Sequence, residues 1–397
     1  MGVVRSGMML GCRLVWRDGM IGRMNLCRQL SLSAASMDKD MTATFKVTEF
    51  RGVGMDIPSN EVTATKGQLL EYMRDMLRMR KMENAAGSLY MQQFIRGFCH
   101  LYDGQEAVVV GADAAMTNED AVITSYRNHC HQLSRGSDMG SILAELTGRR
   151  TGCQKGKGGS MHMFVRRSNY FGGQGIVGAQ CPVGAGLAFA QQYKNTGRVA
   201  VTSFGDGAAN QGQLAEAINM AAIWNLPCVF LCENNRYGMG TSTDRASGSG
   251  KDFYQRGVFI PGLKIDGMDV LAVRQGMEHA VKHARENGPV YVEVDTYRYH
   301  GHSMSDPGTT YRDRGEIQEV RSKRDPIHLV KSRILDNEWA SDVDLKQMEK
   351  ETKSETDRAV EFAKTSPEPT PLSLWEDVYV DDVPIRGTTP FNGSRSS

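Results

Sequence analysis

Short apolar strands that alternate with helices constrain the fold of this chain more than any other feature. Apolar, β-branched runs predict strands at 121–125, 199–203, 228–232 and 290–294. Periodicity predicts helices at 66–93, 104–116, 141–148, 183–194, 212–225, 270–286 and 342–364. Strands separated by helices favour a largely parallel sheet with helices on both faces, so we expect an α/β fold. Such sheets bind ligands beyond the carboxyl ends of their strands.

The expected helix at 66–93 carries large apolar side chains at spacings of three and four residues. These are Leu69, Leu70, Met73, Met76, Leu77, Met79 and Met82. A methionine stripe of this kind packs into a core, or against another subunit, far more often than it binds a cofactor. We therefore expect this helix to be a packing element.

The charge balance and the cysteines exclude several classes of protein. The chain has 47 basic and 46 acidic residues, and its net charge of +1 is too small to favour nucleic acid or an anionic membrane surface. It has no apolar run of about 18 residues, so we expect no membrane span. Its eight cysteines include no Cys-x-x-Cys pair, which favours a reducing compartment over a disulfide framework or a paired-cysteine zinc module.

Residues 1–36 contain five arginines and a single acid, Asp18, among Leu, Met and Ser. This composition is typical of a mitochondrial transit peptide, although its glycines weaken a helix and leave a solvated basic tail as the alternative. After it we expect an α/β domain with N-terminal helices over 37–330. A C-terminal helix and an extended, proline-rich tail are expected over 331–397.

Polar residues follow two neighbouring strands of the expected sheet. Gly205-Asp206-Gly207 follows the strand at 199–203, and Asn234-Asn235 follows the next one. A carboxylate and an amide oxygen at one sheet edge suit Mg²⁺, which takes its other ligands from water and a phosphate. The glycines let backbone N–H groups approach an anion at the start of the next helix. Arg127, just past the strand at 121–125, would offset the charge of a diphosphate.

Together these residues resemble the signature of the thiamine diphosphate-dependent enzymes. In this chain, 26 residues lie between Gly205-Asp206-Gly207 and Asn234-Asn235. The resemblance implies a thiamine diphosphate cofactor. It further implies that Asp206, Asn235 and the backbone carbonyl of Tyr237 hold the Mg²⁺ ion that bridges the cofactor's diphosphate.

Five longer segments make the resemblance more specific. They are Gly97 to Leu101, Lys155 to Met163, Gly175 to Gln180, Gly205 to Gln211, and Tyr297 to Pro307. These segments are similar to the alpha subunits of the mitochondrial pyruvate dehydrogenase decarboxylating component, in the thiamine diphosphate-dependent 2-oxo acid dehydrogenase family. The similarity runs from about residue 45 to the end, is dense over 95–327 and is loose in the last fifty residues. It implies that 37–330 is the diphosphate-binding module of that fold, followed by a C-terminal helical extension.

The resemblance also implies roles for single residues. Tyr126 and Arg127 would contact the cofactor phosphates, with Gly207 and Ala208 supporting the diphosphate. Gly175 and Val177 would offer backbone groups to the pyrimidine ring. His100 and His302 would face the reacting centre as catalytic residues, and His302 would also contact the cofactor.

Partners follow from the same resemblance. We find no glutamate here that would activate the cofactor, and family members of this type receive it from a beta subunit in a heterotetramer of two alpha and two beta chains. The product would pass to a lipoyl group of the acyltransferase component in the mitochondrial matrix. Ser303, and less clearly Ser242, match phosphorylation positions of the family, so a kinase and a phosphatase are expected partners. The family's other serine is Thr310 in this chain.

Three competing motifs favour other chemistry less well. Gly173-x-Gly175-x-x-Gly178 spells a dinucleotide fingerprint, but we expect no strand before it and no acid lies about 20 residues on. His279 and His283 share a helical face, yet Glu278 precedes them, which breaks the order of the zinc-protease motif. His129, His131, His300 and His302 are candidate zinc ligands with Asp306, although polar or loop-structuring roles are the better interpretation.

Three functions therefore remain open. The first is thiamine diphosphate-dependent decarboxylation of pyruvate. The second is the same chemistry on a branched-chain 2-oxo acid or on acetoin. The third is a degenerate scaffold or regulatory subunit, which the intact Asp206, Asn235 and Arg127 disfavour.

Overall fold

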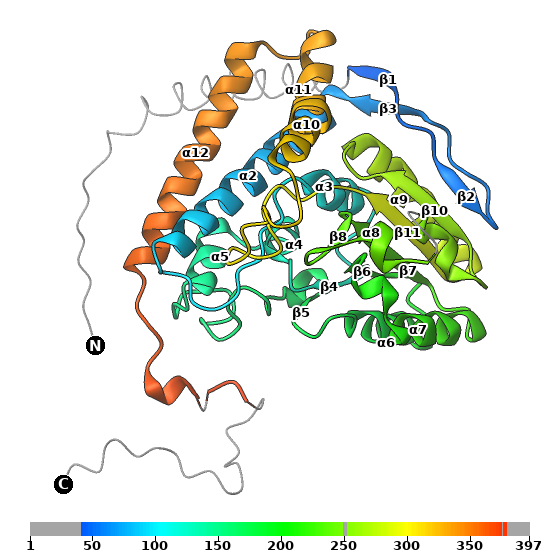
Figure 1. Cartoon of the computed structure of the whole chain (residues 1–397), viewed down its shortest axis with the longest axis horizontal. Coiled ribbons are helices and arrows are strands. Elements are labelled where there is room, and N and C mark those ends of the chain that lie inside the picture. Colours follow the sequence, from blue (N-terminus) through cyan, green and yellow to red (C-terminus); the bar gives the residue numbers. More distant parts are fainter. Residues whose placement is uncertain (1–40, 249–251, 375, 379–397) are drawn as a thin grey trace, which may run out of the picture.

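The computed structural model describes residues 41–248, 252–374 and 376–378, so the expected transit peptide at 1–36 lies outside the described residues. A seven-stranded sheet in the order β2-β10-β11-β7-β6-β4-β5 forms its centre (Figure 1). Its strands are β2 (Arg51–Val53), β4 (Ala121–Ser125), β5 (Tyr170–Gln174), β6 (Ala200–Gly205), β7 (Cys228–Asn234), β10 (Gly262–Asp266) and β11 (Val290–Asp295). All neighbouring pairs are parallel except β2 with β10. The predicted α/β fold with a largely parallel sheet is confirmed.

The strand predictions are correct but incomplete. The four predicted runs correspond to β4, β6, β7 and β11. The expectation that no strand precedes the dinucleotide-like motif at 173–178 is wrong, because β5 leads into the motif, includes its first residue, Gly173, and pairs with β4. β5 contains Gly172 and Gly173 and is an edge strand, so it lacks the β-branched residues that identify a buried strand.

Two smaller strand pairs lie outside the central sheet. β1 (Thr42–Lys46) pairs antiparallel with β3 (Glu61–Thr65), and β8 (Tyr237–Gly238) pairs with β9 (Thr241–Ser242). The β8–β9 pair stabilises the chain directly after Asn235. This pair therefore lies at the edge of the sheet where a ligand is expected to bind.

All seven predicted helices are confirmed, with ends shifted by at most three residues. The longer helices are α2 (Lys66–Met91), α3 (Glu106–Ala114), α4 (His129–Ser134), α5 (Met139–Leu146), α6 (Gln180–Tyr193), α7 (Gly212–Ile223), α9 (Val270–Asn287), α10 (Arg314–Arg324), α11 (Pro326–Asp336) and α12 (Asp342–Thr365). Sequence patterns miss α4, α10 and α11. In α10 no residue is buried, so this helix has no apolar periodicity to detect.

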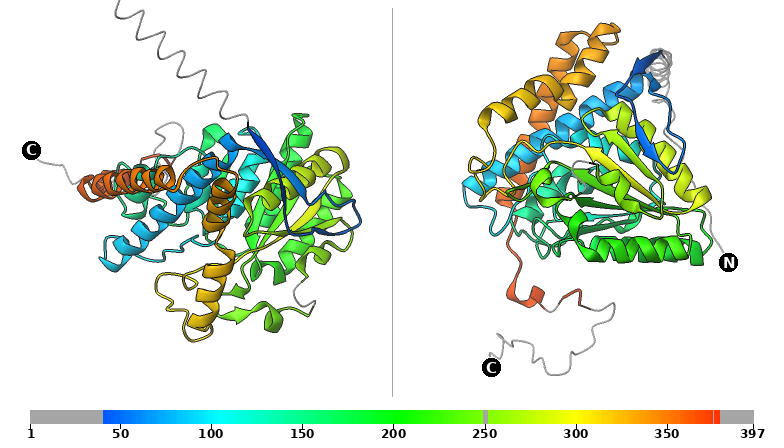
Figure 2. Two further views of the ribbon diagram at one scale, coloured as in Figure 1. Left: turned by 90° about the horizontal axis from the view of Figure 1, so that it is seen from above. Right: turned by 45° about the vertical axis from the view of Figure 1, so that its right-hand side comes forward.

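The helices cover both faces of the sheet (Figures 1 and 2). Alternate residues of β7 show the division: Val229 and Leu231 belong to the core shared with α3 and α9, whereas Phe230 and Cys232 belong to the core shared with α6 and α7. This alternation is the period of two that a pleated strand imposes. Among the described residues, no helix has the length and apolar character needed to cross a membrane.

Helix α2 is a packing element, as predicted. Thr65 caps its first turn, and Gln68 completes the capping box. Met73, Met76 and Met79 are at most 1% exposed. Helices α11 and α12 pack against α2, and their apolar residues join its core (Figure 2).

Glu145 in α5 holds the glycine-rich loop formed by residues 154–160. Its buried carboxylate accepts the backbone N–H groups of Gln154, Gly156, Gly158 and Gly159 at 2.7–3.1 Å. Hydrogen bonds to a buried charged carboxylate are stronger than those between neutral groups, so Glu145 holds the loop firmly. Without this carboxylate, the backbone N–H groups of the loop would be buried and unpaired.

We expect Glu145→Gln to destabilise the fold by about 2–4 kcal/mol, because the amide keeps only one acceptor oxygen and turns its NH₂ group toward N–H donors. Urea unfolding of the purified chain measures this effect. Glu351→Gln on the exposed face of α12 is the matched control, and equal stability of the two variants would contradict the assignment.

Candidate active site

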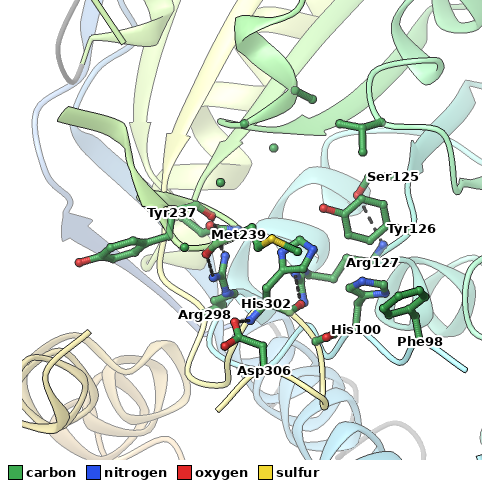
Figure 3. Close-up of a pocket in the computed structure, with 18 of the residues that line it drawn as sticks. Phe98, His100, Ser125, Tyr126, Arg127, Tyr237, Met239, Arg298, His302 and Asp306 are labelled. Carbon is green, nitrogen blue, oxygen red and sulfur yellow. Dashed lines mark hydrogen bonds between the residues drawn. The ribbon is translucent and has the colours of Figure 1, made fainter. Parts of the chain in front are cut away.

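A cavity opens at the carboxyl ends of β4, β6 and β7 (Figure 3). Its volume is about 910 Å³, within the range of small-molecule and cofactor sites. Nearly every residue expected at the site lines it: His100, Tyr126, Arg127, Gly175, Val177, Asp206, Gly207, Ala208, Asn235, Tyr237, His302 and Ser303. Ser242 does not line it, and instead borders a neighbouring cavity of about 300 Å³.

Asp206 follows β6 directly and is 3% exposed. Burial raises the pKa of Asp206 to about 6, while the charge of Arg298 and backbone N–H groups of Asp206 and Asn235 act in the opposite direction. A 3₁₀ turn (Ala208–Asn210) connects Asp206 to α7, which begins at Gly212, so the segment after β6 leads into a helix as expected. Such a buried carboxylate is suited to binding a cation.

Glycines leave space beside Asp206. A Cβ atom on Gly238 would lie 3.0 Å from the Cα atom of Gly207 and 3.8 Å from Oδ2 of Asp206. The two backbones therefore approach too closely for side chains. Replacement of either glycine would press into the space next to the carboxylate.

Asn235 and Tyr237 present two oxygens to one positive charge. Nη1 of Arg298 donates to Oδ1 of Asn235 at 3.1 Å and to the backbone carbonyl of Tyr237 at 2.7 Å. Nδ2 of Asn235 donates to Oε1 of Gln105 at 3.1 Å, which fixes the amide with its oxygen toward Arg298. The amide and carbonyl oxygens named in the sequence therefore point to one place, as Figure 3 shows for Tyr237 and Arg298.

The residues present suit a hard cation such as Mg²⁺. The set consists of one carboxylate, one amide oxygen and one backbone carbonyl oxygen, and hard divalent cations prefer oxygen ligands. Within the described ranges, no three His, Cys, Asp or Glu side chains cluster as a metal site. This result disfavours a zinc site built from the histidines.

The segment that follows Asn235 adopts an unusual backbone. Arg236 (φ 73°) and Met239 (φ 56°) lie in the left-handed region, which costs about 1 kcal/mol or more for residues other than glycine. Arg298 donates to the carbonyls of Tyr237 and Met239, and pairing of β8 with β9 adds further support. Buried Arg298 thus maintains the conformation that turns these oxygens toward the site.

Arg298 also joins the site to the loop that carries His302. Its Nη2 donates to the hydroxyl of Tyr311 at 3.1 Å, and Tyr311 hydrogen-bonds Oδ2 of Asp306. Oδ2 of Asp306 accepts the backbone N–H of His302 at 2.7 Å. The sequence motif contained Arg298, but nothing in its spacing indicated that the guanidinium returns to Asn235.

His100, Tyr126 and His302 form an aromatic group on one wall of the cavity (Figure 3). Ring centroids lie 4.4 Å apart for His100 and Tyr126, and 5.2 Å apart for the two histidines. Burial lowers the pKa of His100 to about 2 and that of His302 to about 4, and the charge of Arg127 adds to both effects. Both imidazoles are therefore neutral at physiological pH, which suits hydrogen bonding more than proton donation.

Arg127 lies at the cavity, where it also holds two wall segments. Its guanidinium donates to the carbonyl of Leu101 and, at 2.9 Å, to the carbonyl of His302. The side chain is 5% exposed. Arg127 thus positions the segments of both histidines in addition to bringing positive charge to the cavity.

Glu233 is a lining residue that sequence reasoning missed. It precedes Asn234 in β7, where it reads as part of a buried strand. Burial raises the pKa of Glu233 to about 7, and the hydroxyl of Ser203 donates a hydrogen bond to its carboxyl group. An acid at the end of an otherwise apolar strand was the available signal.

Two histidines that do not line the cavity, His300 and His279, have hydrogen-bond partners. His300 Nδ1 lies 2.7 Å from Oδ2 of Asp103, and this hydrogen bond raises the pKa of His300. His279 is half-buried, and its Nε2 lies 2.7 Å from the carbonyl of Asp56. The contact of His300 agrees with the polar or loop-structuring role preferred for it over zinc binding.

Comparison with known proteins gives consistent matches. The family model described as "Dehydrogenase E1 component" matches residues 74–372, well over half of the chain. The chain is 54% identical to the mitochondrial pyruvate dehydrogenase E1 component subunit alpha-1 of Oryza sativa subsp. japonica, over 88% of this chain and 90% of that protein. It is 55% identical to the testis-specific mitochondrial E1 alpha subunit of Homo sapiens, over 84% and 86%. The E1 alpha subunit of Dictyostelium discoideum is 52% identical, over 85% and 89%.

Proposed function

The chain belongs to the dehydrogenase E1 component family, and from this we propose that it is the alpha subunit of a pyruvate dehydrogenase E1 component. The enzyme would decarboxylate pyruvate oxidatively and pass the acetyl group to a lipoyl group. The relatives matched over most of their length carry this name, which supports pyruvate over a branched-chain 2-oxo acid or acetoin.

One observation carries the assignment to this cavity. Oxygens of Asp206, Asn235 and Tyr237 gather at one part of the cavity, and His100 and His302 line the same space. We propose that the oxygens hold Mg²⁺ and that Tyr126, Arg127, Gly207, Ala208 and His302 bind the diphosphate of thiamine diphosphate.

Gly175 and Val177 would receive the pyrimidine end of the cofactor. A Cβ atom on Gly175 would lie 3.0 Å from Cε1 of His162, so only glycine leaves the backbone accessible there. When bound, thiamine diphosphate supplies the nucleophilic carbon and the electron sink that decarboxylation of a 2-oxo acid requires.

The chain itself contributes binding, orientation and hydrogen bonds. Arg127 would offset the negative charge that remains when a diphosphate meets Mg²⁺ and one carboxylate. Neutral imidazoles at His100 and His302 would donate hydrogen bonds to the oxygen that gains charge on the substrate. Nδ1 of His100 is buried without a hydrogen-bond partner among the described residues, which leaves it available for this contact.

A beta subunit completes the proposed enzyme. Of the acids that line the cavity, Asp206 belongs to the metal set, Glu233 is bound by Ser203, and Asp306 is bound by Tyr311 and His302. As the similarity to the family implies, the glutamate that activates the cofactor would come from the beta chain in a heterotetramer of two alpha and two beta chains. The acyltransferase component would then receive the acetyl group.

Relatives named mitochondrial support a mitochondrial location, and we propose the matrix as the compartment. Phosphorylation of Ser303, and of Ser242, by a kinase and its reversal by a phosphatase would regulate the enzyme. Ser303 is 5% exposed at the cavity wall, so a phosphate there would place negative charge against an anion-binding site. Thr310 lines the same cavity on the loop that Ser303 begins.

The proposed function predicts a clear substrate preference. The chain co-expressed with its beta subunit should decarboxylate pyruvate at least about tenfold more efficiently, by kcat/KM, than 2-oxoisovalerate, since one or two extra methyl groups in a fitted pocket change binding by about 1–3 kcal/mol. The alpha chain alone should be inactive. A preference for 2-oxoisovalerate or acetoin would contradict the assignment.

A further inference from the structure

Glu83, His129 and Ser160 form a buried hydrogen-bonded triad outside the cavity. Oε2 of Glu83 lies 2.9 Å from Nδ1 of His129, and Nε2 of His129 lies 2.8 Å from Oγ of Ser160. The three residues are 0%, 1% and 7% exposed, respectively. They come from α2, the start of α4 and the end of the glycine-rich loop, which are distant in sequence.

The order of groups is that of a serine-hydrolase triad, but the surroundings do not suit hydrolysis. Met161 lines the large cavity, whereas Ser160 is not among the described residues that line it. A nucleophile must reach its substrate, and a buried hydroxyl away from the cavity cannot do so. The triad therefore requires another explanation.

Glu83 and Ser160 contact the segment of the cavity wall that carries His100. The other oxygen of Glu83 accepts the backbone N–H of Tyr102 at 3.0 Å. Ser160 lies next to Cys99, where burial raises the pKa of the thiol and the hydroxyl of Ser160 acts in the opposite direction. His100 lies between Cys99 and Tyr102, so one flank of this histidine is hydrogen-bonded to the triad and the other lies beside Ser160.

The segment beside the triad also contacts the segment that carries His302. The carbonyl of Cys99 accepts the backbone N–H of Met304 at 2.9 Å, and Met304 follows His302 by two residues. His129 itself follows Tyr126 and Arg127 closely in sequence. All the aromatic groups on this wall thus join the triad through the backbone.

We propose that Glu83, His129 and Ser160 are positioning residues that set the placement of His100 against Tyr126 and His302. The proposal rests on the proposed function, because it assigns the triad to that reaction. The carboxylate of Glu83 accepts a hydrogen bond from Nδ1–H of His129, and Nε2 of His129 then accepts a hydrogen bond from the hydroxyl of Ser160. The hydroxyl then ties the glycine-rich loop and Cys99 to α2.

A positioning role affects turnover more than binding. The cofactor and substrate contacts proposed above do not include the triad, whereas His100 must meet the reacting oxygen with little tolerance. A misplacement of about 1 Å costs about a hundredfold in rate, so a smaller shift should cost about tenfold.

Ser160→Ala in the co-expressed alpha–beta enzyme tests the proposal. We expect kcat to fall about tenfold, with KM for pyruvate and the Kd for thiamine diphosphate with Mg²⁺ changed by less than twofold. Ser168→Ala is the matched control, because Ser168 is 3% exposed and its hydroxyl donates to the carbonyl of Arg135 at 2.7 Å, away from the cavity. It should lower the melting temperature as Ser160→Ala does and leave kcat unchanged.

Equal kcat values for the two variants would overturn the positioning role, as would a rise in KM or cofactor Kd without a fall in kcat. Failure of Ser160→Ala to assemble with the beta subunit would also overturn it, because positioning leaves assembly intact. Labelling of Ser160 by a fluorophosphonate probe would show an activated nucleophile instead. Wild-type turnover of pyruvate, measured in parallel, tests the proposed function separately.

Discussion

Asp206→Ala should abolish metal-dependent binding of thiamine diphosphate and reduce turnover by at least about a hundredfold. Asp206 is the one anionic ligand in the proposed metal set, and loss of a single outer-shell partner already costs metal sites about 10–100-fold. The measurement is calorimetric titration of Mg²⁺ and thiamine diphosphate into the co-expressed enzyme, followed by a decarboxylation assay.

The melting temperatures of the Asp206 variants distinguish loss of metal binding from misfolding. Burial raises the pKa of Asp206 to about 6, so the ionised carboxylate is held at a cost in the cofactor-free protein. Asp206→Asn should therefore melt at the same temperature as the parent or higher, while it also loses metal binding. Asp357→Ala on the exposed face of α12 is the control and should leave both properties unchanged. Retention of cofactor affinity by both Asp206 variants would contradict the proposed site.

Ser303→Glu should reduce turnover of the reconstituted enzyme by about a hundredfold or more. Ser303 is 5% exposed, and its hydroxyl lies 2.8 Å from that of Ser305, so an ionised carboxylate would be buried beside Asp306 and a cavity built for anions. The least costly response is for the loop to leave its place, which would remove His302 from the wall and release its contact with Arg127.

Two controls separate charge from size and place. Ser303→Ala should keep most of the activity, and Ser322→Glu on exposed α10 adds the same charge without an effect. Limited proteolysis should cut the Ser303→Glu enzyme within 300–311 faster than the parent enzyme. Unchanged activity of Ser303→Glu would refute the regulatory proposal.

Sequence patterns predicted elements well where burial leaves a periodic signal. β7 lies between two cores, and α2 carries one apolar face, so both could be identified from side-chain type alone. β5 has two glycines and α10 has no buried residue, so neither shows a pattern in the sequence. The same limit explains why no strand was expected before the glycine motif that begins at Gly173.

By itself, the sequence determined which residues gather at the ligand edge. In a parallel sheet the carboxyl ends of neighbouring strands meet, so Asp206 after β6 and Asn235 after β7 had to lie close together once the strands were recognised. That conclusion needs only the position of each residue directly after its strand.

Only the tertiary structure decided how those residues are held. Arg298 binds Asn235 from 63 positions away, and Glu83 reaches Ser160 through His129 from two other segments. Such contacts depend on how separate helices and loops pack, because a side chain's direction follows from its surroundings and not from its spacing. The sequence therefore indicated the chemical groups, and packing fixed the geometry in which they can act.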